Sequence, residues 1–201
     1  MMKQTIETVI NLMAASAITA PKAGGKDCLE IVALTDSIDL QRIADEMRKY
    51  AHNSSKENYW HRDAKNTENS QGLLLIGLAG PVTAGYDCGG CGFATCNEFE
   101  QERELKDFEM GYTGPHCIMR MMDIGVALAS AAKQASLLNI DNRVQQRVGA
   151  AARALGYIKC EVAMGIPISI SGKSIFYDRK TLSKKVLAEN KNSDDPVLEQ
   201  E

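Results

Sequence analysis

Six cysteines are the residues of this 201-residue sequence most suited to chemistry, and four of them are spaced like metal ligands. Two residues separate Cys88 from Cys91, four more precede Cys96, and Cys117 follows after another twenty. Three clustered thiolates and one remote thiolate suit a cuboidal 4Fe-4S cluster, because the short loop binds three irons and the remote cysteine binds the fourth. The spacing therefore predicts one such cluster on these four residues.

Glycines surround the clustered cysteines and would have a physical role at such a site. They are Gly85, Gly89, Gly90 and Gly92. Glycine tolerates positive φ angles and close backbone approach, so amide N–H groups can turn toward the sulfurs and offset the negative charge of the cluster. Cys117 follows Pro115 at an expected helix start, where unpaired amides and the positive end of the helix dipole would also face the cluster.

Three other uses of these cysteines remain open from spacing alone. Zinc also binds four thiolates, although structural zinc sites usually pair two C-x₂₋₄-C units and the second unit is absent here. A redox-active dithiol at Cys88 and Cys91 leaves Cys96 and Cys117 without a role. Structural disulfides are typical of small secreted domains that carry cysteines throughout. Here the cysteines are concentrated in the middle of the chain, which favours thiolate ligands in a cytoplasmic protein.

Helices and strands alternate along the chain, which predicts one mixed domain over residues 1–201 with the strand directions left open. The residues around the cysteines, 85–120, form a cluster-binding segment within it, and 176–201 form a polar C-terminal tail. Residues 53–70 are predicted to be loop or a short surface helix. Helices are predicted at 3–18, 39–50, 97–109, 117–138 and 142–155, and buried strands at 28–35, 72–80 and 159–167.

Charge and hydropathy exclude two classes of partner. The net charge is −3 and no basic block is present, so the footprint of a nucleic-acid-binding protein is missing. No apolar run is long enough to span a membrane. Acidic residues follow Cys96, and they would form either a solvated helix face or a docking surface for a basic redox partner. Their positions are Glu98, Glu100, Glu102, Glu104, Asp107 and Glu109.

The sequence CGGCGFATC, completed by Cys117, resembles the small iron–sulfur domain of electron-transfer complex subunits and corrinoid iron–sulfur proteins, CxxCGxxxC…C. This resemblance covers about 30 residues and implies that Cys88, Cys91, Cys96 and Cys117 are the cluster ligands. The whole chain resembles a bacterial and archaeal family described as containing a ferredoxin domain. Together these resemblances imply an iron–sulfur protein that transfers electrons. The alternative is a non-enzymatic binding or assembly module with a structural cluster or zinc site.

Outside the cysteine segment, the chain is similar to the FMN-dependent nitroreductases. The similarity rests on Ala20-Pro21-Lys22-Ala23-Gly24, Leu155-Gly156 and Gly165-Ile166-Pro167. It implies an α+β fold with a central sheet flanked by helices, a homodimer, FMN at the dimer interface and an oxidoreductase activity. The arginine–serine–arginine group with which that family grips the FMN phosphate is absent, since no arginine precedes Arg42. Lys22 and Lys26 could bind the phosphate instead, or could be solvated loop lysines.

Overall fold

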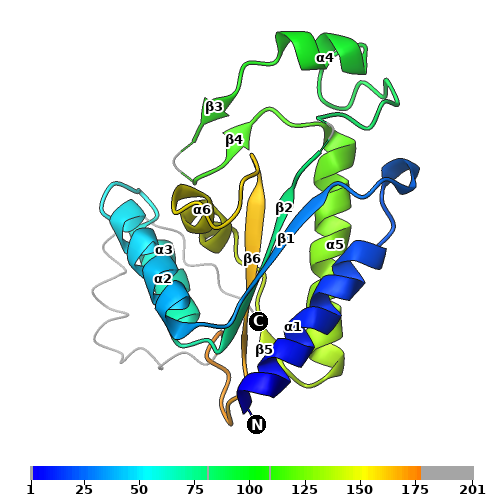
Figure 1. Ribbon diagram of the computed structural model, residues 1–201. Coiled ribbons are helices and arrows are strands. Elements are labelled where there is room, and N and C mark those ends of the chain that lie inside the picture. The colour runs from blue at the N-terminus through cyan, green and yellow to red at the C-terminus, as the bar shows by residue number, and fades with distance from the viewer. Residues whose placement is uncertain (1, 81, 109, 178–201) are drawn as a thin grey trace, which may run out of the picture.

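The computed structural model describes residues 2–80, 82–108 and 110–177, and its centre is a four-stranded antiparallel sheet in the order β1-β2-β6-β5. The strands are β1 (Leu29–Leu34), β2 (Gly72–Leu78), β5 (Asp141–Asn142) and β6 (Ala163–Ser169). One face of the sheet is covered by α1 (Met2–Thr19) and α5 (Ile118–Leu137) (Figure 1). The other face is covered by α2 (Ser37–Ala51), α3 (Glu57–Glu68) and α6 (Gln146–Ala154). The predicted α+β fold with a central sheet flanked by helices is confirmed.

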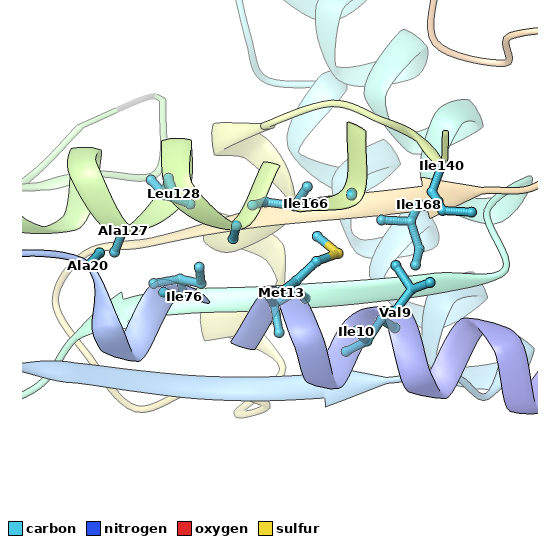
Figure 2. Packing of buried hydrophobic residues seen from close by; sticks show 14 of the residues in the cluster. Val9, Ile10, Met13, Ala20, Ile76, Ala127, Leu128, Ile140, Ile166 and Ile168 are labelled. Atoms are coloured by element: carbon cyan, nitrogen blue, oxygen red, sulfur yellow. The ribbon is translucent and has the colours of Figure 1, made fainter. Parts of the chain in front are cut away.

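Strand β2 shows why two helical layers form. Leu74 and Ile76 belong to the cluster packed against α1 and α5, whereas Leu73 and Leu75 belong to the cluster packed against α2, α3 and α6. Successive side chains of a strand point to opposite faces, so an uninterrupted apolar run needs cover on both sides. Figure 2 shows the first cluster, in which Met13 of α1 lies among apolar side chains of β2, β6 and α5.

Helix α6 approaches β6 closely because glycines stand at their contact. A Cβ atom on Gly149 would lie 1.9 Å from the carbonyl oxygen of Ala163. A Cβ atom on Gly165 would lie 2.4 Å from Cγ1 of Val148. Both distances are far below ordinary van der Waals contact, so glycine is required at both positions for this packing. The close contact positions residues 155–161, which connect α6 to β6.

Four segments differ from the sequence predictions. The helix predicted at 142–155 begins only at Gln146, because Asp141–Asn142 form β5, and the strand predicted at 159–167 lies at Ala163–Ser169. The other two are residues 53–70 and 97–109. Residues 57–68 form the full helix α3, whose Trp60 is completely buried and stacks on Tyr50 with 4.9 Å between ring centroids. The apolar pattern of this helix is weak because its inner face also buries the polar side chains of Asp63 and Thr67. The helix predicted at 97–109 ends early: α4 spans only Cys96–Glu102, and Lys106–Asp107 form β3, paired with β4 (Thr113–Gly114).

The early end of α4 has a tertiary cause. Arg103 adopts an extended backbone conformation at the helix C-cap, and its guanidinium donates two hydrogen bonds of 2.9 Å to the carboxylate of Glu161. Local helix propensity is therefore overridden by a partner 58 residues away in sequence. Part of the predicted acidic helix, Glu109, and most of the predicted tail, 178–201, lie outside the described residues.

Candidate metal centre

Asp87 closes the cysteine loop on itself. Its backbone N–H donates to Sγ of Cys96 over 3.4 Å, and its Oδ1 accepts from the backbone N–H of Cys96 over 2.6 Å. Cys88 and Cys96 therefore stand at the two ends of one closed loop. The spacing of the cysteines did not predict this clip. Asp87 has a φ of 47°, a conformation that aspartate tolerates better than most residues.

Two reciprocal side chain–backbone hydrogen bonds cap the N-terminus of α4, the helix that begins with Cys96. Oγ1 of Thr95 accepts from the N–H of Glu98 over 3.1 Å, and the carboxylate of Glu98 accepts from the N–H of Ala94 over 2.9 Å. Threonine followed three residues later by glutamate is a sequence signature of such a cap, so it was available as a signal for the α4 start. The cap holds Cys96 in place at the end of the loop.

The glycines of the cysteine loop have the two predicted uses. Gly85, Gly89 and Gly92 have φ angles of 78°, 68° and 90°, which confirms the need for left-handed backbone. Gly90 instead allows a close approach: a Cβ atom there would lie 2.5 Å from Cγ2 of Ile118 and 3.7 Å from Sγ of Cys88. The C-x₂-C loop thus rests directly on the first residue of α5.

Cys117 is the N-cap residue of α5 and is 4% exposed. Its side chain makes no capping hydrogen bond, so the first amides of the helix are not satisfied by it. The expectation that Cys117 stands at a helix start is confirmed. Because Ile118 follows it immediately, the contact with Gly90 places the loop of Cys88 and Cys91 against the same helix end.

The four cysteines are only partly gathered in this structure. All are free thiols; Cys88 is exposed, Cys91 and Cys96 are partly exposed, and Cys117 is buried. Across residues 2–80, 82–108 and 110–177, no three side chains of cysteine, histidine, aspartate or glutamate are grouped closely enough to hold a metal ion. The donor chemistry fits an iron–sulfur cluster, because four thiols come from contacting segments rich in left-handed glycine. The ligand assignment stays a prediction.

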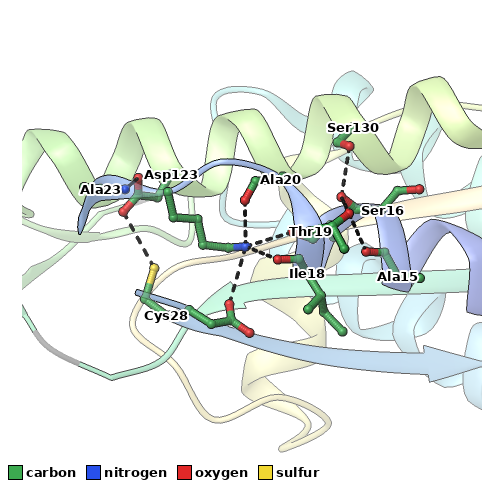
Figure 3. A network of polar contacts seen from close by, with 12 residues as sticks. Ala15, Ser16, Ile18, Thr19, Ala20, Ala23, Cys28, Asp123 and Ser130 are labelled. Carbon is green, nitrogen blue, oxygen red and sulfur yellow. Dashed lines mark hydrogen bonds and ion pairs between the residues drawn. The ribbon is translucent and has the colours of Figure 1, made fainter. Parts of the chain in front are cut away.

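The two lysines predicted for a flavin phosphate differ in their surroundings. The ammonium of Lys22 is buried at the C-terminal end of α1, where it donates to the carbonyl oxygens of Ala17, Ile18 and Ala20 over 2.6–3.1 Å (Figure 3). It also lies 3.5 Å from a carboxylate oxygen of Asp27. These are the carbonyls that a helix end leaves unpaired, so Lys22 caps α1. Lys26 is exposed at the end of the same loop.

A buried polar network joins that loop to α5. Oδ1 of Asp123 accepts from the N–H of Ala23 over 2.8 Å, and Oδ2 accepts from the guanidinium of Arg120 over 2.8 Å. Sγ of Cys28 lies 3.8 Å from the same Oδ2 (Figure 3). Burial is the main cause that raises the pKa of the Cys28 thiol. Cys28 is therefore a buried, protonated thiol.

Cys160 lies at the other edge of the site, in the segment between α6 and β6. Burial, assisted by the charge of Glu30, raises the pKa of its thiol to about 11. Its Sγ donates to the carbonyl oxygen of Val162 over 3.1 Å. A protonated, internally bonded thiol is a poor metal ligand, so Cys160 differs from the four cysteines of the predicted motif.

Comparison with known proteins identifies the family. A family model described as "Uncharacterized protein containing a ferredoxin domain" matches residues 113–179, which include Cys117. A protein of Archaeoglobus fulgidus described as an uncharacterized protein is 43% identical over 169 residues, covering 84% of this chain and 88% of that protein. The chain belongs to this ferredoxin-domain family. The predicted resemblance of the whole chain to this family is confirmed, whereas the matched residues include Cys117 and not Cys88, Cys91 or Cys96.

Solved structures resemble the fold of this ferredoxin-domain protein. A nitroreductase with bound FMN from Desulfitobacterium hafniense aligns with a TM-score of 0.56 at 11% identity, over 89% of this chain and 84% of that chain. A nitroreductase with bound FMN from Bacteroides fragilis aligns with a TM-score of 0.52 at 11% identity, over 96% and 87%. At this identity the likeness concerns the fold, and it confirms the predicted nitroreductase-like architecture.

Proposed function

We propose that this ferredoxin-domain protein is a cytoplasmic iron–sulfur redox protein that holds one 4Fe-4S cluster on Cys88, Cys91, Cys96 and Cys117. The observation that carries the proposal is the contact between Gly90 and Ile118, 2.5 Å from a Cβ atom on Gly90 to Cγ2 of Ile118. It sets the C-x₂-C loop against the helix end that carries Cys117, which supports a site shared by the remote cysteine and the clustered ones. The family description supports a redox role.

When bound, a cluster with four cysteine ligands exchanges single electrons and has no iron open to a substrate. The chain's own residues would shape this exchange. Left-handed glycines would let backbone amides turn toward the sulfurs, and the burial of Cys117 would keep one corner of the cluster away from water. Cys88 is exposed, so the opposite side of the cluster would lie near the surface.

Acidic and apolar side chains are exposed both in the loop that carries Cys88 and at and beyond the end of α4. They are Tyr86, Asp87, Glu100, Glu102, Glu104, Leu105 and Asp107, and the exposed Lys106 stands among them. Negative charge around apolar side chains suits a redox partner with a basic, partly apolar patch, because opposite charges steer the two proteins together. We expect reduction by such a partner to slow as ionic strength rises.

The cluster is tested by metal analysis of anaerobically purified protein. About four irons and four sulfides per chain, with a brown colour and visible absorption that bleaches on reduction, are the expected result. One zinc per chain and a colourless protein would replace this proposal with a structural zinc site. A cluster that no reductant bleaches would favour the binding or assembly module.

Single cysteine replacements test the ligand set. Cys117→Ser should lower the iron content strongly, and Cys88→Ser, Cys91→Ser and Cys96→Ser should do the same. Cys28→Ser is the matched control, because Cys28 is buried at 2% exposure in a hydrogen-bonded network outside the motif. Unchanged iron content in Cys117→Ser would show that the fourth ligand is another residue. Loss of iron in Cys28→Ser would show that iron loss is not specific to the four cysteines of the motif, and would contradict the proposed ligand set.

A second candidate function, an FMN-dependent oxidoreductase, is favoured by the fold. Both nitroreductases compared above contain FMN. Of the two predicted phosphate ligands, Lys26 is exposed and Lys22 is engaged with the end of α1. Release of a yellow, fluorescent compound on denaturation would support this function. Failure to retain FMN after incubation and gel filtration would leave a flavin-free electron carrier.

We also propose a homodimer that forms through α5. Three apolar side chains along the helix, Ile118, Met122 and Val126, are 42%, 49% and 41% exposed. They recur every four residues and therefore form one stripe, which a second copy would cover. Sedimentation should give twice the chain mass, and Met122→Lys should shift it toward the monomer. A wild-type monomer at high concentration would contradict this proposal.

A further inference from the structure

A cavity of about 820 Å³ opens beside Cys117. It lies between the end of β2, helix α6, the segment 156–161 that follows α6, and the β3–β4 hairpin. Its volume falls within the range of about 300–1,000 Å³ that is usual for small-molecule sites. The cavity is distinct from the loop that carries Cys88, Cys91 and Cys96, because Cys117 is the one predicted cluster ligand in its lining.

The charged side chains of the cavity leave a positive surplus. Its lining includes four cations, Arg103, Arg120, Arg153 and Lys159, and two carboxylates, Asp107 and Glu161. Two of the cations are already neutralised, since Arg103 pairs with Glu161 over 2.9 Å and Arg120 pairs with Asp123 over 2.8 Å. Arg153 and Lys159 form no ion pair with any residue that the structure describes.

Arg153 is oriented toward the hairpin side of the cavity. One of its terminal nitrogens, Nη1, donates to the carbonyl oxygen of Gly111 over 3.1 Å, and Gly111 itself lines the cavity. Guanidinium groups bind phosphate and carboxylate through several parallel hydrogen bonds, so an Arg held by one donor retains others for an anion. Lys159 lines the same cavity, and its exposed ammonium can add a second charge.

The remaining walls are apolar. Leu78 from β2, Phe108 from the hairpin and Ile158 from the segment after α6 line the cavity together with alanines of α6. A fully charged, small inorganic anion would leave these walls uncovered. An apolar body that carries one anionic group matches both the walls and the unpaired cations.

We propose that this cavity binds a small organic anion, a flat apolar body with one phosphate or carboxylate, whose anionic group contacts Arg153 and Lys159. Cys117 lines the cavity, so the ligand would lie against one corner of the cluster. That adjacency rests on the proposed function, whereas the binding itself does not. The anion could be a cofactor such as a flavin phosphate or a substrate that exchanges electrons with the protein.

Two matched probe pairs test the proposal on the full, iron-loaded chain by calorimetric titration. FMN is compared with riboflavin, which lacks the phosphate, and 2-naphthoate is compared with the neutral 2-naphthamide. At least one anion should bind roughly tenfold or more tightly than its neutral partner, since charge-assisted hydrogen bonds to an Arg exceed neutral ones. If only FMN binds more tightly than its neutral partner, the ligand is cofactor-like. If 2-naphthoate binds more tightly than 2-naphthamide, the ligand is substrate-like.

Charge-removing variants locate the site. Arg153→Gln should abolish most of the preference for the anion, and Lys159→Gln, a change at an exposed side chain, should reduce it severalfold. Lys65→Gln is the matched control, because Lys65 is an exposed lysine of α3 outside the lining, and it should keep the full preference. Thermal melting of each variant confirms that it is folded.

Three outcomes would overturn the proposal: neither anion binds, the anions bind no better than their neutral partners, or Lys65→Gln weakens binding more than Arg153→Gln and Lys159→Gln do. The cluster is measured separately as iron and sulfide per chain. If no anion binds to a protein that contains about four irons per chain, the cavity proposal fails and the proposed cluster stands. If the anions bind more tightly than their neutral partners but the protein contains no iron, the cavity proposal stands and the cluster proposal fails.

Discussion

The contact between Gly90 and Ile118 yields the sharpest prediction, for the variant Gly90→Ala. The added methyl group would lie 2.5 Å from Cγ2 and 3.3 Å from Cβ of Ile118, whereas ordinary contacts begin at 3.4 Å. Ile118 is β-branched and stands in the first turn of α5, where one χ1 rotamer is strongly preferred, so Cγ2 cannot rotate aside freely. The loop must therefore move away from the helix by about 0.9 Å.

A movement of this size matters more for the cluster than for the fold. Metal–ligand distances tolerate only about 0.2 Å, so a displaced C-x₂-C loop would separate the proposed ligands Cys88 and Cys91 from the proposed ligand Cys117. The loop is largely exposed, and it can shift without opening the core. We expect Gly90→Ala to lose most of its iron and sulfide while its metal-free melting temperature stays near that of the wild type.

The double variant Gly90→Ala, Ile118→Ala tests the cause. Replacing Ile118 removes Cγ2 and leaves only the 3.3 Å contact with Cβ, which needs a shift of a few tenths of an ångström. Iron content should therefore recover in large part. Gly172→Ala is the control, because a Cβ atom there meets nothing within 4 Å. Full iron in the single variant, or no recovery in the double variant, would refute the placement of the loop on α5.

Three further predictions concern the scaffold. Gly149→Ala places a methyl group 1.9 Å from the Ala163 carbonyl oxygen inside the core, so it should lower the free energy of unfolding, measured in urea, by about 1–3 kcal/mol or more. An unchanged midpoint of urea unfolding would contradict the close packing of α6 against β6. In metal-free protein at about pH 8, iodoacetamide should modify Cys88 well before Cys160, because a pKa of about 11 leaves roughly one Cys160 thiol in a thousand ionised. Mass spectrometry of digests taken at successive times measures the order of modification, and modification of Cys160 first would contradict the prediction. The hydrogen bonds from Arg103 hold the pKa of Glu161 below its usual range, so this carboxylate stabilises the fold above the ordinary glutamate pKa, and the stabilisation is lost as the pH falls through the lowered pKa. Between about pH 6 and pH 3, the melting temperature should therefore fall more for the wild type than for Glu161→Gln. Parallel curves of melting temperature against pH would exclude the effect.

Local patterns predicted much of the fold correctly. The two helices on one face of the sheet, α1 and α5, and the strand β2 were evident because their apolar residues follow the period of the element or run without interruption. The start of α2 also has a local cause, because the side chain of Asp36 accepts from the N–H of Ile38 over 2.9 Å. Helix α3 was missed as a full helix, since its buried face includes charged and polar residues whose partners come from elsewhere. One such partner is Arg147 of α6, which binds Asp63 over 3.1 Å.

The sequence by itself determined the chemistry of this protein: four thiols in a CxxCGxxxC…C pattern, glycines between them, and membership of a ferredoxin-domain family. Those properties depend on residue types and short spacings, which the chain carries before it folds. The tertiary structure decided where these groups meet. Gly90 rests on Ile118, Lys22 turns into the end of α1, and Arg153 faces a cavity beside Cys117. The first and third of these contacts join segments far apart in the chain, and only packing determines which side chains remain available to a ligand.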